Sequence, residues 1–545
     1  MRSKAILVAL LAFAFVAQAA PVSERQATLA ARAWAVACKK FGTRLGSSVE
    51  QVRELALTNG ASFFAVKMKG GGAVIVSGDS EDSPIVAMSS ADISNPEVGS
   101  PLRDLIERDA FVRKNAVRSA AKTREAQRRW LRLVGAGEAL DRAGAGEGRV
   151  PPSDVAPTDM RVPALVESEW GQDKRGENYY TPNHYVCGCV ATAMAQVMRY
   201  HRFPVEAIDP FSATCYIDGV ATLCEARGGV YDWDNMPLIP STSMPDVKKE
   251  AIGHLTYDCG VAVGMDWGSS ISSAFMSNVG PAMKLRFGYA NAEVSTDTNI
   301  STDESLREKM IYASLDAGFP VQLGINRLAG NAGHAVVADG YGYIDDVSYV
   351  HLNMGWHGQG NVWYHLPDIT YMSTSSGAMY EADIIVTCTY NVFPKQTGVV
   401  ISGRTMADDG EVLAGAEVSV FRAGEAEPFT NLTSSAYGVY AVIVPAGDYT
   451  VSATAANGFS GETSISVADE NTWGNDVVLR APSVRVITSD GSSTNVWSTL
   501  DSALRNAALL EGATVEIFTN TVLKGDFSIT NDCRIVAGQI GRAHV

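Results

Sequence analysis

Cysteine is scarce in this chain, which has eight cysteines among 545 residues. Domains that depend on disulfide bonds carry cysteine far more densely, so disulfides are not expected to be the main stabiliser. Cys215 and Cys224 flank Gly219 in a polar segment, which leaves open one bridge across a hairpin. Cys187 and Cys189 form a Cys-x-Cys pair, but no second pair follows with metal-ligand spacing. We therefore expect neither a metal site nor a cofactor.

The chain also lacks a net positive charge and long apolar runs. The net charge is −16 and the pI is near 5.0, whereas a protein that binds nucleic acid needs a basic surface to meet the phosphate backbone. After the N-terminal residues, no apolar stretch is long enough to cross a membrane. The chain is too long for one core, so we expect about three or four domains. The oligomeric state stays open.

The N-terminus has the pattern of a secretory signal. Arg2 and Lys4 precede the apolar residues 5–16, and Ala17-Gln-Ala19 is a small-x-small cleavage site. This order of positive end, short apolar core and small residues is typical of a signal peptide. We predict that residues 1–20 are removed and that the protein is secreted or placed at the cell surface. A retained membrane anchor is the alternative.

Two units are expected before the central domain. Residues 21–100 form a small α+β unit, with a helix over 23–41 and strands at 61–66, 72–76 and 84–89. Residues 101–159 form a second segment, whose first part, 101–134, is helical and rich in arginine. That part is either a solvated helix face or a basic strut docked on an acidic neighbour. Residues 135–158 are rich in Gly, Ala and Pro and predict an exposed, cleavable linker.

The remainder divides into three parts. Residues 160–390 form the large central domain. Residues 398–481 show short alternating strands at even spacing, a pattern that predicts a β-sandwich. Residues 482–545 begin another unit, with a helix over 499–510 and strands near Val515 and Ile529, and this partial module suggests a truncated chain.

The first residue that could take part in a reaction is Cys189, which opens an apolar helical stretch, CVATAMAQVMRYH. The N-terminus of a helix favours an anion, so the thiol pKa falls there. A cysteine alone is more often a small buried apolar residue than a nucleophile. The interpretation of Cys189 as a nucleophile therefore depends on whether the chain supplies a base.

His334 and Asn353 supply the missing residue types, in the order Cys, His, Asn. His334 follows Cys189 by 145 residues, within the ~130–150 expected for papain-like chains. A thiolate attacks a peptide carbonyl, a histidine carries the proton, and a neutral amide fixes the ring tautomer. The backbone N–H of Cys189 and the side chain of Gln172 are the candidate oxyanion donors.

At this point the sequence closely resembles the streptopain family of cysteine peptidases, a bacterial branch of the papain-like fold. The similar blocks are residues 170–172, 188–201, 231–237, 257–263, 333–335 and 351–356. The resemblance implies an α+β papain-like endopeptidase over residues 160–390, with Cys189 as nucleophile and His334 as base. It also implies that Gln172 binds the oxyanion, that Asn353 orients the histidine, and that Trp356 shields that pair.

The flanking units extend the resemblance. Residues 63–89 are similar to the inhibitory propeptide of that family, which implies a zymogen activated by a cut in the linker. Residues 399–480 resemble carboxypeptidase regulatory-like modules, which implies attachment or spacing. Two residues depart from the family pattern: Met354 replaces a Trp, and His357 replaces a Gly. His357 is either a surface residue or a group that biases the pH dependence.

We therefore predict a secreted cysteine endopeptidase, made as a zymogen, that hydrolyses protein substrates and is inhibited by its own propeptide. One alternative is a Cys-His-Asn acyl transferase or amidase. The other is a surface adhesin with an inactive protease-like domain. The joint presence of Cys189, His334, Gln172 and Asn353 argues against a decayed site.

Overall fold

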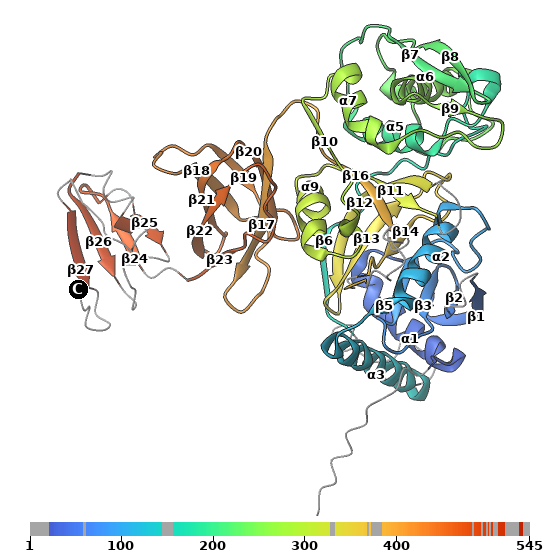
Figure 1. Ribbon diagram of the computed structural model, residues 1–545. Helices are drawn as coiled ribbons and strands as arrows, with labels where there is room; N and C mark the ends of the chain where they lie inside the picture. Colours follow the sequence, from blue (N-terminus) through green and yellow to red (C-terminus); the bar gives the residue numbers. More distant parts are fainter. Residues whose placement is uncertain are drawn as a thin grey trace, which may run out of the picture.

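The computed structural model describes residues 21–57, 62–143, 156–327, 333–367, 370–371 and 384–481, and short pieces between 484 and 537. The predicted signal peptide and residues 144–155 of the predicted linker lie outside the described residues. Within the described part, no helix is both long and apolar enough to span a bilayer. The chain is a multidomain protein of mixed α/β structure (Figure 1).

The N-terminal unit is a helix on a four-stranded antiparallel sheet. Helix α1 (Glu24–Ala37) begins at Ser23, whose side chain forms a capping box with Gln26. The strands are β1 (Ser48–Ala56), β2 (Ser62–Lys69), β3 (Ala73–Ser77) and β4 (Ile85–Ser89). The expected strands are present. The sequence did not predict β1, because it is an edge strand with mostly exposed, charged side chains.

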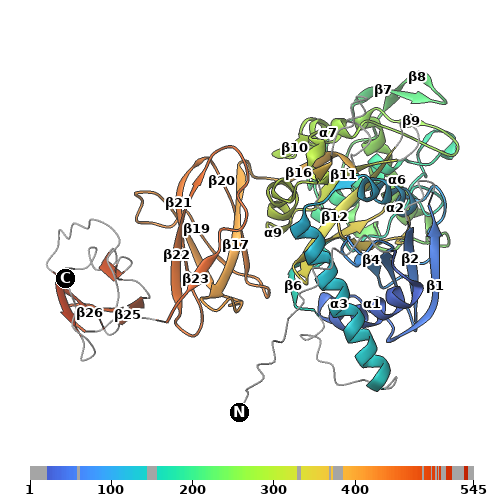
Figure 2. The ribbon, with the colours of Figure 1, turned by 60° about the horizontal axis from the view of Figure 1, so that its bottom comes forward.

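The single helix predicted over 101–134 is wrong. The chain forms α2 (Pro101–Lys114), a short β5 (Ala116–Val117) and α3 (Ala120–Ala143). Helix α3 continues through residues 135–143, where a linker was expected. Gly137 explains the difference, because a Cβ there would lie 2.4 Å from the carbonyl oxygen of Leu29 in α1. This glycine lets two helices pack closely and does not end one (Figure 2).

Helix α3 is docked by its basic side chains. Arg132 forms an ion pair with Asp345 at 2.5 Å, and Nε of Arg129 donates to the Asp345 carbonyl at 3.1 Å. Asp345 lies in the turn between β12 (Gly333–Ile344) and β13 (Val347–Asn353). The basic strut docked on an acidic neighbour is thus the alternative that these contacts favour.

One eleven-stranded sheet joins the N-terminal unit to the central domain. Its order is β1-β2-β3-β4-β14-β13-β12-β11-β16-β10, with β6 paired to β12. The junction is β4 with β14, where Met88 pairs with Trp363 in antiparallel register. The central strands are β6 (Thr158–Val162), β10 (Asn291–Ser295), β11 (Val321–Asn326), β14 (Val362–Tyr364) and β16 (Ile385–Phe393).

A helical lobe covers one side of this sheet (Figure 1). It contains α5 (Cys189–His201), α6 (Asp246–Val263), α7 (Val279–Phe287) and a small sheet of β7 (Ser212–Ile217), β8 (Val220–Glu225) and β9 (Asp266–Trp267). The core of the lobe also includes Ala335 and Val337 of β12, so the lobe and the sheet share apolar contacts. Cys215 and Cys224 lie in the β7–β8 hairpin as free thiols.

Residues 399–479 form two small sheets over a common apolar core, which includes Val418, Tyr440 and Val451. One sheet has β17 (Val399–Ala407), β20 (Val439–Val444) and β23 (Val477–Leu479). The other has β18 (Glu417–Arg422), β19 (Thr430–Thr433), β21 (Gly447–Thr454) and β22 (Ser460–Val467).

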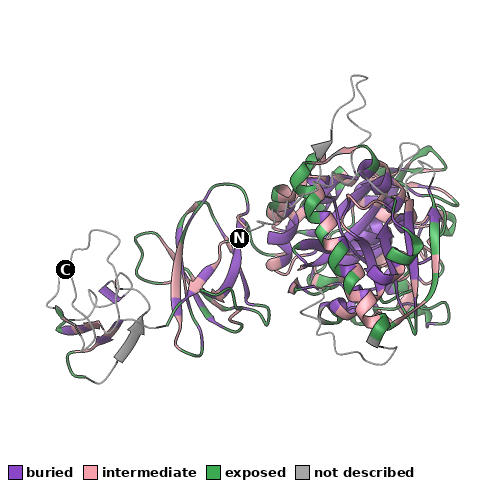
Figure 3. Cartoon of the chain, turned by 90° about the horizontal axis from the view of Figure 1, so that it is seen from below, coloured by how far each residue is buried: buried purple, intermediate pink, exposed green. Residues whose placement is uncertain are grey.

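The last described residues form one further sheet. Its strands are β24 (Val484–Ile487), β25 (Thr494–Trp497), β26 (Ala513–Ile517) and β27 (Cys533–Ala537). Most of the helix predicted over 499–510 and the strand predicted near Ile529 lie outside the described residues. Figure 3 shows that most of the buried residues lie in the joint body of the N-terminal unit and the central domain. The short remaining elements are α8 (Glu304–Arg307), α9 (Ala313–Asp316) and β15 (Thr370–Tyr371).

Candidate active site

A cavity of about 1230 Å³ separates the helical lobe from the sheet. Four of the five predicted site residues line it: Gln172, Cys189, His334 and Trp356. Cys189 comes from the first turn of α5, and His334 comes from the start of β12. Helix and sheet therefore present the thiol and the imidazole to one another across the cavity.

Cys189 has the electrostatic character of a nucleophile. Burial alone would raise the pKa of its thiol, but the hydrogen bond and charge of His334 outweigh burial and lower that pKa. Gly188 precedes it with φ +89, in the left-handed region that glycine adopts most easily. With ψ 143, this backbone conformation is one that residues with a Cβ rarely adopt, so the turn favours a glycine.

His334 is held as an imidazolium. Burial disfavours its charge, but hydrogen bonds to Asp104 and Cys189 outweigh burial and raise its pKa to about 9. Its ring also meets Trp356 edge to face, with centroids 6.4 Å apart. The thiol and the imidazole therefore each favour the charged form of the other, and Trp356 lies beside the imidazole.

Asp104 of α2 reaches the site from the segment that follows the N-terminal unit. Its Oδ2 lies 3.0 Å from Nε2 of His334 and accepts from Nε of Arg327 at 2.5 Å. Burial opposes the charge of this carboxylate, but its bonds to His334 and Arg327 prevail and lower its pKa. Sequence reasoning missed Asp104 and Arg327. In a charge-rich helix, the sequence alone does not distinguish an aspartate that contacts a distant histidine from a solvated carboxylate.

Asn353 has different partners from those expected. Its Nδ2 donates to the Ser168 carbonyl at 2.7 Å, and its Oδ1 accepts from Nε2 of Gln196 at 3.2 Å. No hydrogen bond joins Asn353 to His334, both of which the structure describes. The orienting role predicted for Asn353 is therefore not seen in this state, because its amide is occupied and Asp104 holds Nε2 of the histidine.

Gln196 is a second residue that sequence reasoning missed. It is fully buried in α5, and its Oε1 accepts from Ser168 Oγ at 2.9 Å and from the Trp170 N–H at 3.1 Å. Together with its bond to Asn353, it connects the segment before Gln172 to the end of β13. A polar residue at a buried helix position is a usable signal for such a link, because buried amides need partners.

Cys187 differs from Cys189 in its surroundings. It is fully buried, its Sγ lies 3.1 Å from Oγ1 of Thr192, and burial raises its pKa. A thiol with a raised pKa is a poor nucleophile at neutral pH. Among the described residues, no cluster of His, Cys, Asp and Glu has the geometry of a metal site.

Comparisons with known proteins agree with this geometry. The model of the peptidase C10 family matches residues 170–364. Streptopain of Streptococcus pyogenes serotype M28 is 27% identical over 326 residues, which are 58% of this chain and 77% of streptopain. The thiol protease/hemagglutinin PrtT of Porphyromonas gingivalis is 28% identical over 204 residues, 37% of this chain and 22% of that protein.

Two solved structures from Prevotella intermedia are also similar. A prointerpain A fragment is 24% identical, with a TM-score of 0.45 over 64% of this chain and 99% of the fragment. Active interpain A is 29% identical, with a TM-score of 0.35 over 42% of this chain and 94% of that enzyme. The match over residues 170–364 and the similarity to streptopain show that this chain carries a peptidase C10 domain and is a cysteine peptidase.

Proposed function

We propose that this protein is a secreted cysteine endopeptidase, made as a zymogen, that cleaves protein substrates through a thioester on Cys189. One observation carries the proposal: the Cys189 thiol at the start of α5 and the His334 imidazole at the start of β12 line the same cavity and shift one another's pKa. The pair lowers the pKa of the thiol and contributes to the raised pKa of the imidazole. Such a pair supplies both the nucleophile and the proton that acyl transfer needs.

The proposed reaction follows from these positions. The thiolate of Cys189 attacks the scissile carbonyl carbon, and the carbonyl electron pair moves onto oxygen. The Cys189 N–H and the Gln172 side chain stabilise that oxyanion. His334 gives its proton to the departing amine, which leaves a thioester. Water then loses a proton to His334 and releases the acid and the thiolate. Trp356 covers the imidazole, and Asn353 supports the loop that carries Trp356.

The N-terminal unit fits an inhibitory propeptide. Asp104 occupies Nε2 of His334, and β4 extends the central sheet by pairing with β14. We assign residues 21–100 to the propeptide, 101–159 to its helical segment and cleavable linker, and 160–390 to a papain-like peptidase domain. The remaining linker residues, 144–157, are the proposed activation site. Residues 1–20 are the proposed signal for secretion or display at the cell surface.

Residues 398–481 fit a β-sandwich of the carboxypeptidase regulatory-like kind, followed by a partial module over 482–545. The sandwich is docked to the peptidase domain by paired amides: Asn391 and Asn471 exchange two hydrogen bonds of 2.9 Å in a buried position. Nε1 of Trp473 donates to the Tyr341 hydroxyl at 2.9 Å. We propose that this module spaces or attaches the enzyme rather than taking part in catalysis.

The test expresses the chain from residue 21 onward, as parent and as Cys189→Ala, with Cys187→Ala as matched control. Under reducing conditions, the parent and the control should convert themselves within or next to residues 144–157 and then digest casein, and Cys189→Ala should do neither. A parent that incorporates amines into casein without cleaving it contradicts the peptidase and favours an acyl transferase. Conversion of Cys189→Ala at the parental rate contradicts the assigned nucleophile.

A further inference from the structure

In the loop that carries Gln172, the backbone N–H and carbonyl groups of Trp170 and Gly171 are all hydrogen-bonded. We call residues 170–172 the Gln172 loop. The Trp170 N–H donates to Gln196, and the Trp170 carbonyl accepts from the His357 N–H at 3.2 Å. The Gly171 N–H donates to Oε1 of Glu177 at 3.0 Å, and its carbonyl accepts from Oγ1 of Thr192 at 3.0 Å. Two of these partners, His357 and Glu177, have no part in the reaction proposed above.

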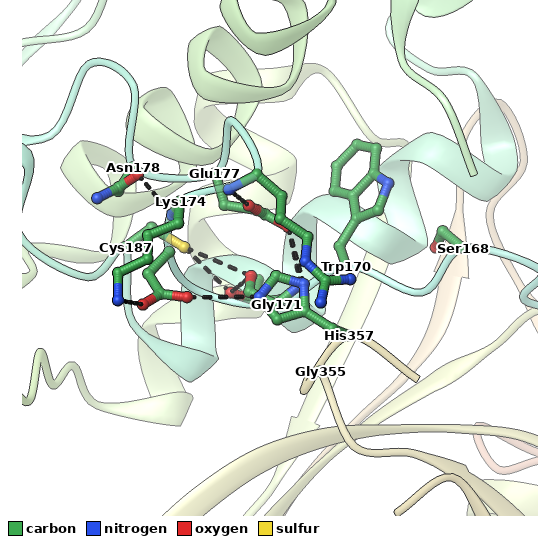
Figure 4. Close-up of polar contacts among 12 residues, drawn as sticks. Ser168, Trp170, Gly171, Lys174, Glu177, Asn178, Cys187, Gly355 and His357 are labelled. Carbon is green, nitrogen blue, oxygen red and sulfur yellow. Dashed lines mark hydrogen bonds and ion pairs between the residues drawn. The ribbon is translucent and has the colours of Figure 1, made fainter. Parts of the chain in front are cut away.

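The His357 ring lies directly on the loop. A Cβ built on Gly171 would lie 2.4 Å from Cε1 and Nε2 of His357, which is closer than any side chain tolerates. The ring therefore occupies the space that a side chain at position 171 would need. Figure 4 shows His357 beside Gly171 and Trp170.

Two carboxylates bracket the imidazole. Nδ1 of His357 lies 3.4 Å from Oε1 of Glu177, and Nε2 lies 3.4 Å from Oδ1 of Asp173, the residue that follows Gln172. Oε1 of Glu177 also accepts from Gly171, and Oε2 accepts from the Arg175 N–H at 3.1 Å. Contacts of His357 thus reach the chain on both sides of Gln172, at Trp170 and Gly171 before it and at Asp173 after it.

Glu177 is fully buried. Burial raises the pKa of its carboxyl, against the bond from Gly171 and the charge of His357. A buried carboxylate is costly unless it is paired and hydrogen-bonded. The buried Glu177 carboxyl therefore depends on its partners, and its bond from the Gly171 N–H fixes the backbone at that position.

The backbone of His357 is strained in the same place. Its φ is +53, in the left-handed region where a residue with a Cβ costs ~1 kcal/mol relative to glycine. His184 has the same φ of +53, but it is exposed and does not line the cavity. The two histidines thus share the strained backbone but differ in their surroundings. At position 357 the contacts of the imidazole with Gly171, Glu177 and Asp173 offset the strain.

We propose that His357 and Glu177 are positioning residues that clamp the Gln172 loop and hold the Gln172 amide toward the developing oxyanion. This inference rests on the proposed role of Gln172 and on Cys189 as nucleophile. His357 and Glu177 act on the reaction only through the loop. Their loss should therefore weaken transition-state stabilisation while the thiolate stays reactive.

Two probes separate these effects. Iodoacetamide alkylates the thiolate: a sulfur–carbon bond forms, iodide leaves, and no oxyanion develops. A peptide aldehyde instead adds the thiolate to its carbonyl carbon, and the electron pair moves onto oxygen, which must be stabilised before it takes a proton from His334. The first probe reports the Cys189–His334 pair, and the second reports that pair together with the Gln172 loop.

The variants are His357→Gly and Glu177→Gln, with His184→Gly as matched control, each converted by an added serine peptidase that is then inhibited. His357→Gly also removes backbone strain, which offsets part of the contacts that it loses. We expect kcat and aldehyde affinity to fall roughly tenfold to a hundredfold in His357→Gly, with KM and the iodoacetamide rate unchanged. Glu177→Gln should show the same split, the double variant should be no worse than His357→Gly alone, and His184→Gly should match the parent.

Two results would overturn the inference. In one, His357→Gly leaves kcat and aldehyde affinity at the parental values. In the other, aldehyde affinity and the alkylation rate fall together, which means that the thiolate pair itself was damaged. A parent that is neither alkylated at Cys189 nor able to hydrolyse peptides overturns the proposed function itself, and the parental arm alone reveals that failure.

Discussion

Oδ2 of Asp104 lies 3.0 Å from Nε2 of His334, although 230 residues separate them in the chain. Asp104 belongs to the unit that precedes the linker, and His334 belongs to the peptidase domain. Arg327 donates to the same carboxylate, so two residues of the peptidase domain that line the cavity hold Asp104. This contact gives the latent state a specific, removable bond at the proposed general base.

Asp104→Asn should accelerate self-conversion. The change keeps the size of the side chain but removes the charge that pairs with His334 and Arg327. One partly exposed, charge-assisted hydrogen bond contributes ~0.5–1.5 kcal/mol, so conversion should be roughly threefold to tenfold faster. The rate is measured by the appearance of the processed chain under reducing conditions. Glu97→Gln, an exposed carboxamide change just before α2, is the control, and an unchanged or slower Asp104→Asn chain would contradict the latch.

The same pair predicts a pH window for the stability of the zymogen. The His334 pKa is raised from 6.5 to about 9, so its contribution is complete below 6.5 and is lost as the pH rises through about 9. The Asp104 pKa is lowered from 3.8, so its contribution is present above 3.8 and is lost as the pH falls through the lowered value. The stabilisation should therefore be largest between these limits.

Thermal unfolding of the full chain tests this window. In a Cys189→Ala background, which is not expected to convert itself, Tm is compared with and without Asp104→Asn across the pH range. The Tm difference should be greatest between about pH 4 and 6.5 and should fall toward pH 9 to the part that the Asp104–Arg327 ion pair contributes. The upper limit falls below 9 in this background, because Cys189 also contributes to the His334 pKa. A difference that is constant with pH would show that the ion pair is not its source.

Gln172→Ala should reduce kcat about a hundredfold and leave the rate of Cys189 alkylation unchanged. The loss is that of one oxyanion donor, and the thiolate–imidazolium pair does not depend on it. The converted enzyme is assayed with a peptide substrate and with iodoacetamide. Equal losses in both assays would show instead that Gln172 supports the pair or the fold.

Asn471→Ala should loosen the docked C-terminal module without changing catalysis. The substitution leaves buried groups of Asn391 and Val400 without their partner and removes a part-buried bond to the Lys309 carbonyl. Each such group costs ~1–3 kcal/mol. We expect a lower Tm and faster proteolysis near residues 394–398, with peptide kcat/KM at the parental value. Asn457→Ala, in an exposed loop of the same module, should match the parent. A reduced kcat/KM would mean that the module does take part in catalysis.

The sequence revealed the parts of the site that local pattern determines. Cys189 was identifiable because a glycine turn and an apolar helix place it at a helix N-terminus. His334 was identifiable because it opens an apolar strand at a suitable distance along the chain. In both cases, the residues that create the environment are neighbours in the sequence. The N-terminal hairpin was also predictable from neighbouring residues, because two apolar strands flank a glycine turn at residues 70–72.

The parts that were missed depend on contacts between distant segments. Asp104 meets His334 only when α2 folds against the start of β12. Glu177 meets His357 only when the segment before α5 folds against the loop after β13. Gly137 suggested a linker, but the close approach of Leu29 gives it a place inside a helix. Asn353 had the expected position and different partners, because the buried Gln196 and the Ser168 carbonyl occupy its amide.

The central claim is that Cys189 is the nucleophile of a latent peptidase, and active-site labelling tests it most directly. The full chain and the converted enzyme are treated with a thiol-directed epoxide under reducing conditions, and the adduct is located by peptide mass spectrometry. The account predicts one adduct at Cys189, formed much faster after conversion, and none at Cys187. An adduct at Cys187, or no adduct at Cys189 in the converted enzyme, would contradict it.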